Sequence, residues 1–457
     1  MTTLRSDAIE IWNAGVDAVR ATPLVRREVH VTDDKLSIGP HQWSRNDFDR
    51  VIVVGAGKAG TAMAEGLIES IADWLPVVGW INVPDGTQRP LSGIHVHPAR
   101  PAGVNEPTAA GVAGTRQMLK LVSTASQRDL CIALISGGGS ALMPAPLDGI
   151  TLQDKLDVTR FLSAAGADIT ELNTVRKHLS SVKGGGLLRA CRAGELVTLV
   201  LSDVLGDPLD LIASGPTVPD TSSAHDALAV LSQYDPARSL GGRIYAALSQ
   251  QPSAGNEPPP HELCKFTTLV LGNNAVAVDE AGLRAEQLGY NHAMQSACRS
   301  EGSAEEVGRR LAEMTVAMLR ADSSGHRTDC LITGGEPTVT LAPDHVRGKG
   351  GRNQQLVLAA YDHLRSVPLT DEEWERCCIL SGGTDGEDGP TDAAGAILDA
   401  EVHRRACELD LDLADHLRKN DSYTYFDQVG GLLKTGATGT NVCDLRVAIV
   451  AGQKSLN

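Results

Sequence analysis

Three stretches of the chain pair a strand-length apolar run with glycines and small hydroxyl residues, a combination that can bind anions. They are residues 131–142 (CIALISGGGSAL), 331–336 (LITGGE) and 379–384 (ILSGGT). Glycine lets backbone N–H groups approach a ligand without a Cβ in the way, and a helix that follows adds unpaired N–H groups of its own. Because ligands of open α/β sheets lie at the carboxyl ends of strands, these stretches predict one shared polar cleft.

Two cations lie in further glycine-rich loops. Lys58 is inside residues 55–60 (GAGKAG), and Arg352 follows the glycines of 348–351 where a helix is predicted to begin. An ammonium gives a compact point charge and a guanidinium a bidentate fork, and both suit phosphate or carboxylate. The alternative interpretation is that each cation is an ordinary turn residue with a solvated side chain and no function. The G-x-G-x-x-G spacing of 55–60 is also typical of dinucleotide-binding turns, but the acid expected about 20 positions later is poorly placed.

Carboxylates follow two of the predicted strands. Asp203 comes directly after the apolar run 196–201, and Asp385 opens an acidic loop that continues to residue 392. A carboxylate in such a place can act as a general base or bind Mg²⁺ together with substrate phosphates. The residues do not decide which carboxylate does which.

A basic stretch lies at residues 172–186. A helix is predicted over 174–188, with Asn173 and Arg176 on one face and Lys183 further along. Taken singly, such charges are usually solvated. The glycines at 184–186 exceed what a helix C-cap needs, so the stretch favours a ligand wall.

Composition excludes several classes of partner. The chain has 457 residues, a formal net charge of −16 and 3% aromatic residues, which argues against nucleic acid and anionic membranes as partners. No apolar run approaches the ~18 residues of a membrane span, and the N-terminus lacks the apolar core of a signal peptide. Nine cysteines without C-x-x-C spacing indicate reduced, buried thiols and a cytoplasmic protein.

Strand and helix patterns alternate along the chain, which predicts an α/β fold with mostly parallel sheets. Residues 251–263 contain four prolines among polar residues and are predicted to be an exposed linker. The predicted domains are therefore residues 1–250 and residues 264–457.

Five motifs together resemble the class II glycerate kinase family, which also carries an older hydroxypyruvate-reductase name and the label MOFRL. They are SGGGS at 136–140, NTVRKHL at 173–179, SDVLGD at 202–207 with ASGPT at 213–217, GKGGRNQ at 348–354, and GGTDG at 382–386. The resemblance covers nearly the whole chain. It implies ATP-dependent phosphorylation of D-glycerate to 2-phosphoglycerate with Mg²⁺. It also implies a Rossmann-like αβα sandwich N-terminal domain and a smaller α/β C-terminal domain with the active site between them. Residues 96–101 (VHPARP) depart from the family pattern, so no role is carried over to them.

The resemblance matches Lys58 and Arg352 to cations of the site and Asp203 to an acid. Our hypotheses go further: the two cations hold the transferring phosphate or the glycerate carboxylate, and Asp203 and Asp385 divide the roles of base and metal ligand. Alanine at either cation should lower kcat roughly a hundredfold or more, with little effect on folding if the cation has no partner. The other residues expected to bind substrate or nucleotide are Gly57, Ser136, Gly137, Gly138, Gly139, Ser140, Asn173, Arg176, Lys183, Glu336 and Asn353.

Two other functions stay open at this point. One is an NAD(P)H-dependent hydroxypyruvate reductase, supported by the 55–60 spacing, and the other is a non-catalytic sensor of sugar acids or phosphate. Neither needs the acidic loop at 385–392, so the kinase is preferred. The donor nucleotide and a homodimeric state are also left open.

Overall fold

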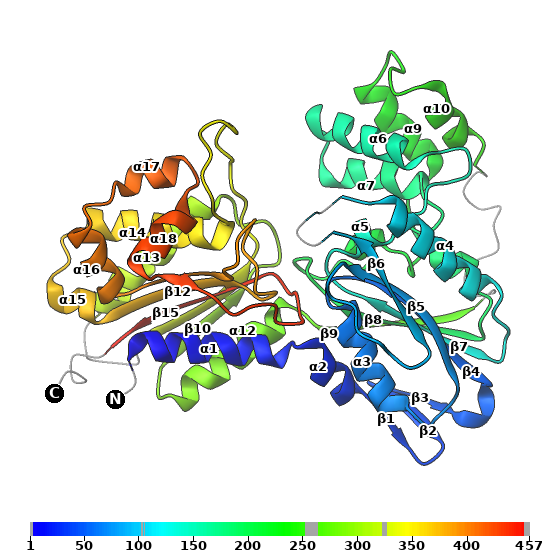
Figure 1. The fold of residues 1–457 in the computed structure, drawn as a ribbon, viewed down its shortest axis with the longest axis horizontal. Coiled ribbons are helices and arrows are strands. Elements are labelled where there is room, and N and C mark those ends of the chain that lie inside the picture. Colours follow the sequence, from blue (N-terminus) through cyan, green and yellow to red (C-terminus); the bar gives the residue numbers. More distant parts are fainter. Residues whose placement is uncertain (1–2, 102–103, 105, 252–263, 322–326, 452–457) are drawn as a thin grey trace. The chain divides into compact units, whose positions relative to one another are not determined.

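The computed structural model describes residues 3–101, 104, 106–251, 264–321 and 327–451, and divides the chain into two compact units (Figure 1). The N-terminal unit comprises residues 21–271, and the C-terminal unit comprises residues 1–20 and 272–457. This division differs from the predicted one at the N-terminus, because helix α1 (Leu4–Ala18) packs with the C-terminal half. Residues 252–263 of the predicted linker lie outside the described residues.

A six-stranded sheet, in the order β6-β5-β4-β7-β8-β9, forms the centre of the N-terminal unit. Its strands are β4 (Arg50–Ala56), β5 (Val77–Pro84), β6 (Ile94–Arg100), β7 (Asp129–Ile135), β8 (Glu195–Leu201) and β9 (Lys265–Gly272). The first five pair in parallel, as predicted. From β4 the chain winds outward through β5 and β6, and it then returns to place β7 on the other side of β4. The carboxyl ends of β4 and β7 therefore flank the topological switch point, where ligands of such sheets bind.

Helices cover both faces of this sheet. Helix α3 (Gly60–Ile71) follows β4 and contacts β5 and β7, whereas α4 (Ala109–Ser123) and α8 (Gly186–Ala190) contribute Met118, Val122, Leu187 and Leu188 to a core on the strands. A separate helical cluster has its own apolar core. Its helices are α6 (Leu152–Ala164), α7 (Ile169–His178), α9 (Ala224–Tyr234) and α10 (Gly242–Ser249). Helix α2 (Ala21–Glu28) and a small antiparallel sheet of β1 (Val29–Thr32), β2 (Lys35–Ile38) and β3 (His41–Ser44) complete the unit.

The predicted helix over 174–188 is wrong, because the chain leaves the helix after His178 and forms a turn before α8. Gly184 and Gly185 have φ values of +53° and +75°, a left-handed conformation that an α-helix cannot contain. Their N–H groups donate to the carbonyls of Ser214 and Gly215. The glycines therefore serve packing within the chain, and Lys183 lies on the turn.

The sheet of the C-terminal unit is mixed, with the order β10-β11-β15-β12-β13-β14. Its strands are β10 (His292–Ser296), β11 (Cys330–Gly335), β12 (Cys377–Gly383), β13 (Gly395–Leu398), β14 (Leu432–Leu433) and β15 (Asp444–Val450). Only β10 and β11 pair in parallel, whereas β15 runs antiparallel between β11 and β12. The expectation of a mostly parallel sheet thus fails here, because the last strand enters the middle of the sheet from the opposite end.

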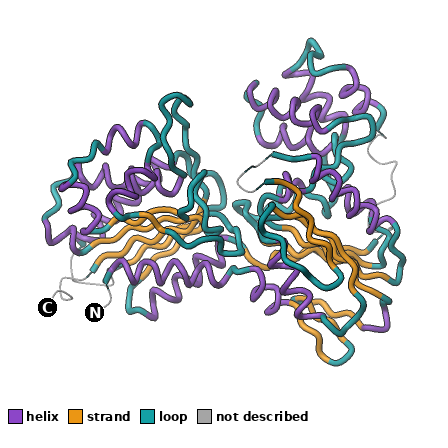
Figure 2. The backbone as a smooth tube through the Cα atoms, viewed as in Figure 1, coloured by secondary structure: helices purple, strands orange, loops and turns teal. Residues whose placement is uncertain are grey.

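Helices also sandwich this second sheet (Figure 2). On one face, α1 and α12 (Asn274–Gln287) bury Trp12 and Val278 against Leu380 and Leu445. On the other face, α13 (Ala304–Arg320) and α14 (Arg352–Ser366) pack with the remaining helices. Those helices are α15 (Asp371–Glu375), α16 (Ala400–Glu408), α17 (Leu413–Arg418) and α18 (Ser422–Val429).

All nine cysteines are free thiols, as predicted, although Cys298 and Cys407 are exposed and only the other seven are buried. Within the described residues, no helix combines the length and apolar character needed to span a membrane.

Candidate active site

The two glycine loops at the switch point of the N-terminal unit pack against each other. The backbone N–H of Lys58 donates to the carbonyl of Gly137 at 2.8 Å, and that of Ala59 donates to Ser136 Oγ at 3.1 Å. A Cβ on Gly57 would lie 1.9 Å from Ser136 Oγ. Glycine at 57 is therefore required by contact with the neighbouring loop, which explains part of the G-x-G-x-x-G pattern without a dinucleotide.

A cationic cluster surrounds the hydroxyl of Ser140, at the end of the second glycine loop. Arg176 Nη2 donates to Ser140 Oγ at 2.8 Å, and Lys183 Nζ also contacts that hydroxyl. Lys183 additionally donates to Ser214 Oγ at 3.2 Å, and Arg176 donates to Asn173 Oδ1 at 3.4 Å. The structure thus brings together four predicted site residues from three separate segments.

Lys155 is a third cation of this cluster. Its ammonium donates to the carbonyls of Arg176 and Leu179, at 3.3 and 3.0 Å. These carbonyls lie at the end of α7, where backbone acceptors lack helical partners. Lys155 therefore holds the last turn of helix α7, which carries Arg176. No pattern in the sequence indicated this role.

Lys183 is buried and Lys155 and Arg176 are partly buried, and none of the three has a carboxylate partner among the described residues. Their hydrogen bonds go to hydroxyl, amide and carbonyl oxygens. Lys183 is only 3% exposed. Burial lowers the pKa of Lys183 well below its usual range, and the positive charges of Arg176 and Lys155 add to this effect. Burial, together with Arg176, lowers the pKa of Lys155 to about 7. A bound anion would remove this penalty, because buried charge needs a partner.

Strained backbone holds Ser214 beside this cluster. Ala213 and Ser214 have φ values of +50° and +62°, and Gly215 follows at +60°. Left-handed conformations of non-glycine residues cost about 1–3 kcal/mol each and persist where the surroundings over-determine them. The Ser214 hydroxyl lies 3.2 Å from Ser140 Oγ, so the strained turn completes the polar lining of the cluster.

The depressed pKa of Lys155 gives a pH prediction for stability. An unfolded lysine has a pKa of about 10.4, so between pH 7 and 10 the folded state binds fewer protons and the free energy of unfolding rises with pH. Relative to Lys155→Met, the wild type should gain at most about 1.4 kcal/mol per pH unit in this window. Urea denaturation at pH 7, 8 and 9 measures the difference. Lys35→Met, at an exposed lysine, is the control: its free energy of unfolding should differ from that of the wild type by an amount that does not change with pH. A difference between Lys155→Met and the wild type that is likewise independent of pH would contradict the prediction.

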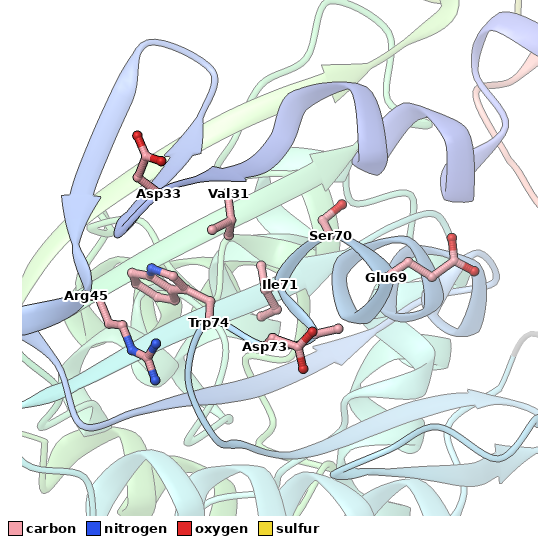
Figure 3. A pocket seen from close by; sticks show the side chains of 9 residues that line it. Val31, Asp33, Arg45, Glu69, Ser70, Ile71, Asp73 and Trp74 are labelled. Carbon is pink, nitrogen blue, oxygen red and sulfur yellow. The ribbon is translucent and has the colours of Figure 1, made fainter.

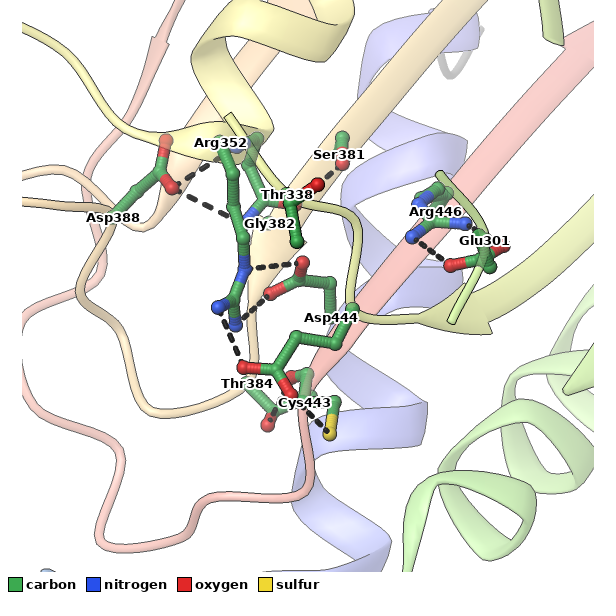
Figure 4. A network of polar contacts seen from close by, with 12 residues as sticks. Glu301, Thr338, Arg352, Ser381, Gly382, Thr384, Asp388, Cys443, Asp444 and Arg446 are labelled. Atoms are coloured by element: carbon green, nitrogen blue, oxygen red, sulfur yellow. Dashed lines mark hydrogen bonds and ion pairs between the residues drawn. The ribbon is translucent and has the colours of Figure 1, made fainter. Parts of the chain in front are cut away.

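An arginine–carboxylate network lies at the strand ends of the C-terminal unit (Figure 4). Arg352 binds Asp444 bidentately, with Nε–Oδ2 at 2.7 Å and Nη2–Oδ1 at 2.9 Å, and its Nη1 donates to Glu336 Oε1 at 2.7 Å. The side chain of Asp444 is 1% exposed. The pKa of Arg352 is raised despite burial, because Asp444 and Glu336 favour its charged form. Three of the five N–H donors of this guanidinium have partners within the described part of the chain, which leaves two for a ligand.

This pairing corrects one expectation. An arginine without a partner would contribute little to folding, but Arg352 neutralises a buried aspartate that the sequence analysis missed. Its only signal was an acid directly before the strand-length stretch 445–450 (LRVAIV).

Strand order explains why these residues meet. In the antiparallel register, Asp444 pairs with Gly335 at the end of β11 and with Gly383 at the end of β12. A Cβ on Gly383 would lie 3.2 Å from Asp385 Oδ1 and 3.7 Å from Asp444 Oδ1. Two of the three predicted strand ends therefore share one polar region, and the third, at Ser136, belongs to the N-terminal unit.

Asn353 serves the internal structure of the C-terminal unit. It is 1% exposed, and its amide accepts from Ser381 Oγ at 2.6 Å and donates to Asp388 at 3.3 Å. Asp388 also accepts the backbone N–H groups of Asn353 and Gln354, which caps α14. Burial raises the pKa of Asp388 to about 7. Asn353 is thus placed to orient the helix that begins at Arg352.

The two candidate metal ligands lie in different units, Asp203 after β8 and Asp385 after β12. Among the described residues, no three His, Cys, Asp or Glu side chains are grouped so that they could hold a metal ion. Mg²⁺ commonly binds through one or two carboxylates plus substrate phosphates and water, and both aspartates fit that mode.

A hollow of about 300 Å³ lies apart from these residues, at the end of α3 and beside the β1–β2 turn (Figure 3). Asp33, Glu69 and Asp73 line it together with Arg45 and Trp74. The excess of carboxylates makes it a poor site for an anion. Helix α3 starts at the glycine loop and reaches the hollow with its last turn, so the two are separate.

The protein is thus of the two-unit α/β class, with glycine loops at a switch point, a cationic cluster in one unit and an arginine–carboxylate network in the other. Two family models match the chain. One described as a domain of unknown function, DUF4147, matches residues 7–249, and the MOFRL family model matches residues 329–444.

Relatives extend over the full length of the chain. Glycerate kinase from Danio rerio is 36% identical over 98% of both chains, and D-glycerate 2-kinase from Thermotoga maritima is 36% identical over 98% of this chain and 99% of its own. The crystal structure of glycerate kinase from Thermotoga maritima matches with a TM-score of 0.81 at 35% identity, over 98% and 99% of the two chains. The chain belongs to the class II glycerate kinase family, as its motifs predicted.

Proposed function

We propose that this protein transfers the γ-phosphate of ATP to the C2 hydroxyl of D-glycerate, giving 2-phosphoglycerate and ADP. The observation that carries the proposal is the cationic cluster of buried Lys183 with partly buried Lys155 and Arg176, which lacks a carboxylate partner among the described residues. Such a cluster is stable when it holds an anion with more than one charge, such as a nucleotide phosphate. Relatives named glycerate kinase support the choice of reaction.

The other roles follow from the chemistry of phosphoryl transfer, which depends on positioning and on stabilising charge. The loop from Gly137 to Gly139, with Ser140, cradles phosphate oxygens, while Lys58 and the two remaining donors of Arg352 bind the transferring group or the glycerate carboxylate. Asp203 and Asp385 act as general base and as ligand of Mg²⁺, which would neutralise phosphate charge. Glu336 orients Arg352.

A coupled assay tests the reaction. ADP should form from ATP only when D-glycerate and a divalent metal are both present, and phosphorus NMR should place the phosphate on C2. Removal of the metal with EDTA should stop turnover, and added Mg²⁺ should restore it. Lys183→Met should raise KM for ATP roughly tenfold or more because a charged phosphate contact is lost, whereas Lys35→Met should not change it.

The reductase remains the alternative to be excluded by the same preparation. Its main support was the spacing of residues 55–60, and contact of Gly57 with Ser136 accounts for part of that spacing. Oxidation of NADH with hydroxypyruvate, without ADP formation from ATP and D-glycerate, would replace the kinase proposal with the reductase.

A further inference from the structure

The turn before β15 is held in a left-handed conformation by two buried side chains. Cys443 has φ +70°, between Val442 and the aspartate that pairs with Arg352. This conformation is unfavourable for any residue with a Cβ, because the Cβ comes too close to the following carbonyl oxygen. Cys443 must adopt it for Asp444 to enter β15 with its side chain directed at the guanidinium (Figure 4).

Asn274 supplies one half of this support. Its amide Nδ2 donates to the carbonyl oxygens of Val442 and Asp444, both at 2.9 Å, and so bridges the turn from one side of Cys443 to the other. Ser296 Oγ donates to Asn274 Oδ1 at 2.8 Å and fixes the orientation of the amide. Asn274 is 6% exposed, and both of its N–H bonds are used.

Thr384 supplies the other half from the end of β12. Its hydroxyl accepts the N–H of Val442 at 2.9 Å and donates to the carbonyl of Cys443 at 2.7 Å, and its own N–H donates to the same carbonyl at 3.0 Å. The carbonyls of residues 442, 443 and 444 thus all have partners in these two residues. Among the described residues, the hydrogen bonds of the Arg352 side chain go to Asp444 and Glu336 and to neither of these two residues.

We propose that Asn274, together with Thr384, is a positioning residue of the reaction: it locks the 442–444 turn so that Asp444 holds Arg352 in place. The inference rests on the proposed function only through the role of Arg352. Because misplacing a catalytic group by about 1 Å can cost roughly a hundredfold in rate, Asn274→Ala and Thr384→Val should each lower kcat by roughly ten- to a hundredfold. KM for both substrates should change little.

A double-mutant cycle separates positioning from a general loss of stability. If Asn274 acts through Asp444, then Asn274→Ala should add little to the loss of kcat already caused by Asp444→Asn, since coupled residues are non-additive. Cys443→Gly should recover part of the activity of Asn274→Ala, because glycine adopts the left-handed turn without support. Leu311→Ala, in the core around α13, should lower the melting temperature and leave kcat unchanged.

Hydrogen–deuterium exchange of peptides covering residues 438–446 keeps this inference distinct from the proposed reaction. Asn274→Ala should speed exchange there whatever the enzyme phosphorylates. Additive losses in the cycle, or unchanged exchange in the folded variant, would overturn the positioning role. Faster exchange in a protein whose wild type shows no glycerate-dependent turnover would instead overturn the proposed function.

Discussion

Arg352→Ala is expected to lower kcat by roughly a hundredfold or more and to destabilise the protein as well. The kinetic loss follows if the two remaining N–H donors stabilise charge that peaks in the transition state. The loss of stability follows because Asp444, 1% exposed, would keep a buried charge without its partner. Breaking a buried ion pair costs about 3–5 kcal/mol, and the low end applies here because Arg352 is 34% exposed. Steady-state kinetics and urea denaturation measure the two effects.

A paired replacement separates the two effects. Arg352→Met combined with Asp444→Leu removes both charges, and apolar side chains can replace a buried pair at little cost in stability. This double variant should recover most of the stability and none of the activity. Recovery of near-normal kcat would show that the ion pair serves the fold alone.

Lys58→Ala is expected to lower kcat by roughly a hundredfold or more while the glycine loop keeps its conformation. The loop that carries Lys58 is held by backbone groups and by Ser136, since its N–H donates to Gly137 and the next N–H to Ser136 Oγ. These bonds survive the substitution, so the loop should keep its conformation. Parallel measurement of kcat and thermal melting decides the matter, and equal small effects on both would favour an ordinary turn residue.

Lys58→Arg is the informative control at this position. A planar guanidinium does not fit a site shaped for a compact ammonium, so this variant should stay well below wild-type kcat although it keeps the charge. Full activity in Lys58→Arg would refute direct contact between Lys58 and the substrate.

The sequence alone predicted the glycine loops and their place at strand ends. In the loops at residues 55–60 and 131–142 the apolar run, the glycines and the start of a helix are contiguous. The N–H groups that could bind an anion come from those same residues. The motifs also led to the correct family, because they are local and in order along the chain. Local patterning was insufficient at residues 174–188, where glycines needed for contact with Ser214 and Gly215 break the predicted helix.

Only the tertiary structure decided which distant residues meet. Asp444 reaches Arg352 because β15 inserts antiparallel between β11 and β12, and Lys155 joins the cationic cluster because α6 packs on the end of α7. Helix α1 joins the C-terminal unit because Trp12 and its neighbours complete a core beneath β12 and β15. Strand order and helix docking depend on how the whole chain buries its apolar surface, whereas the sequence pattern of each segment specifies only which of its own faces is apolar.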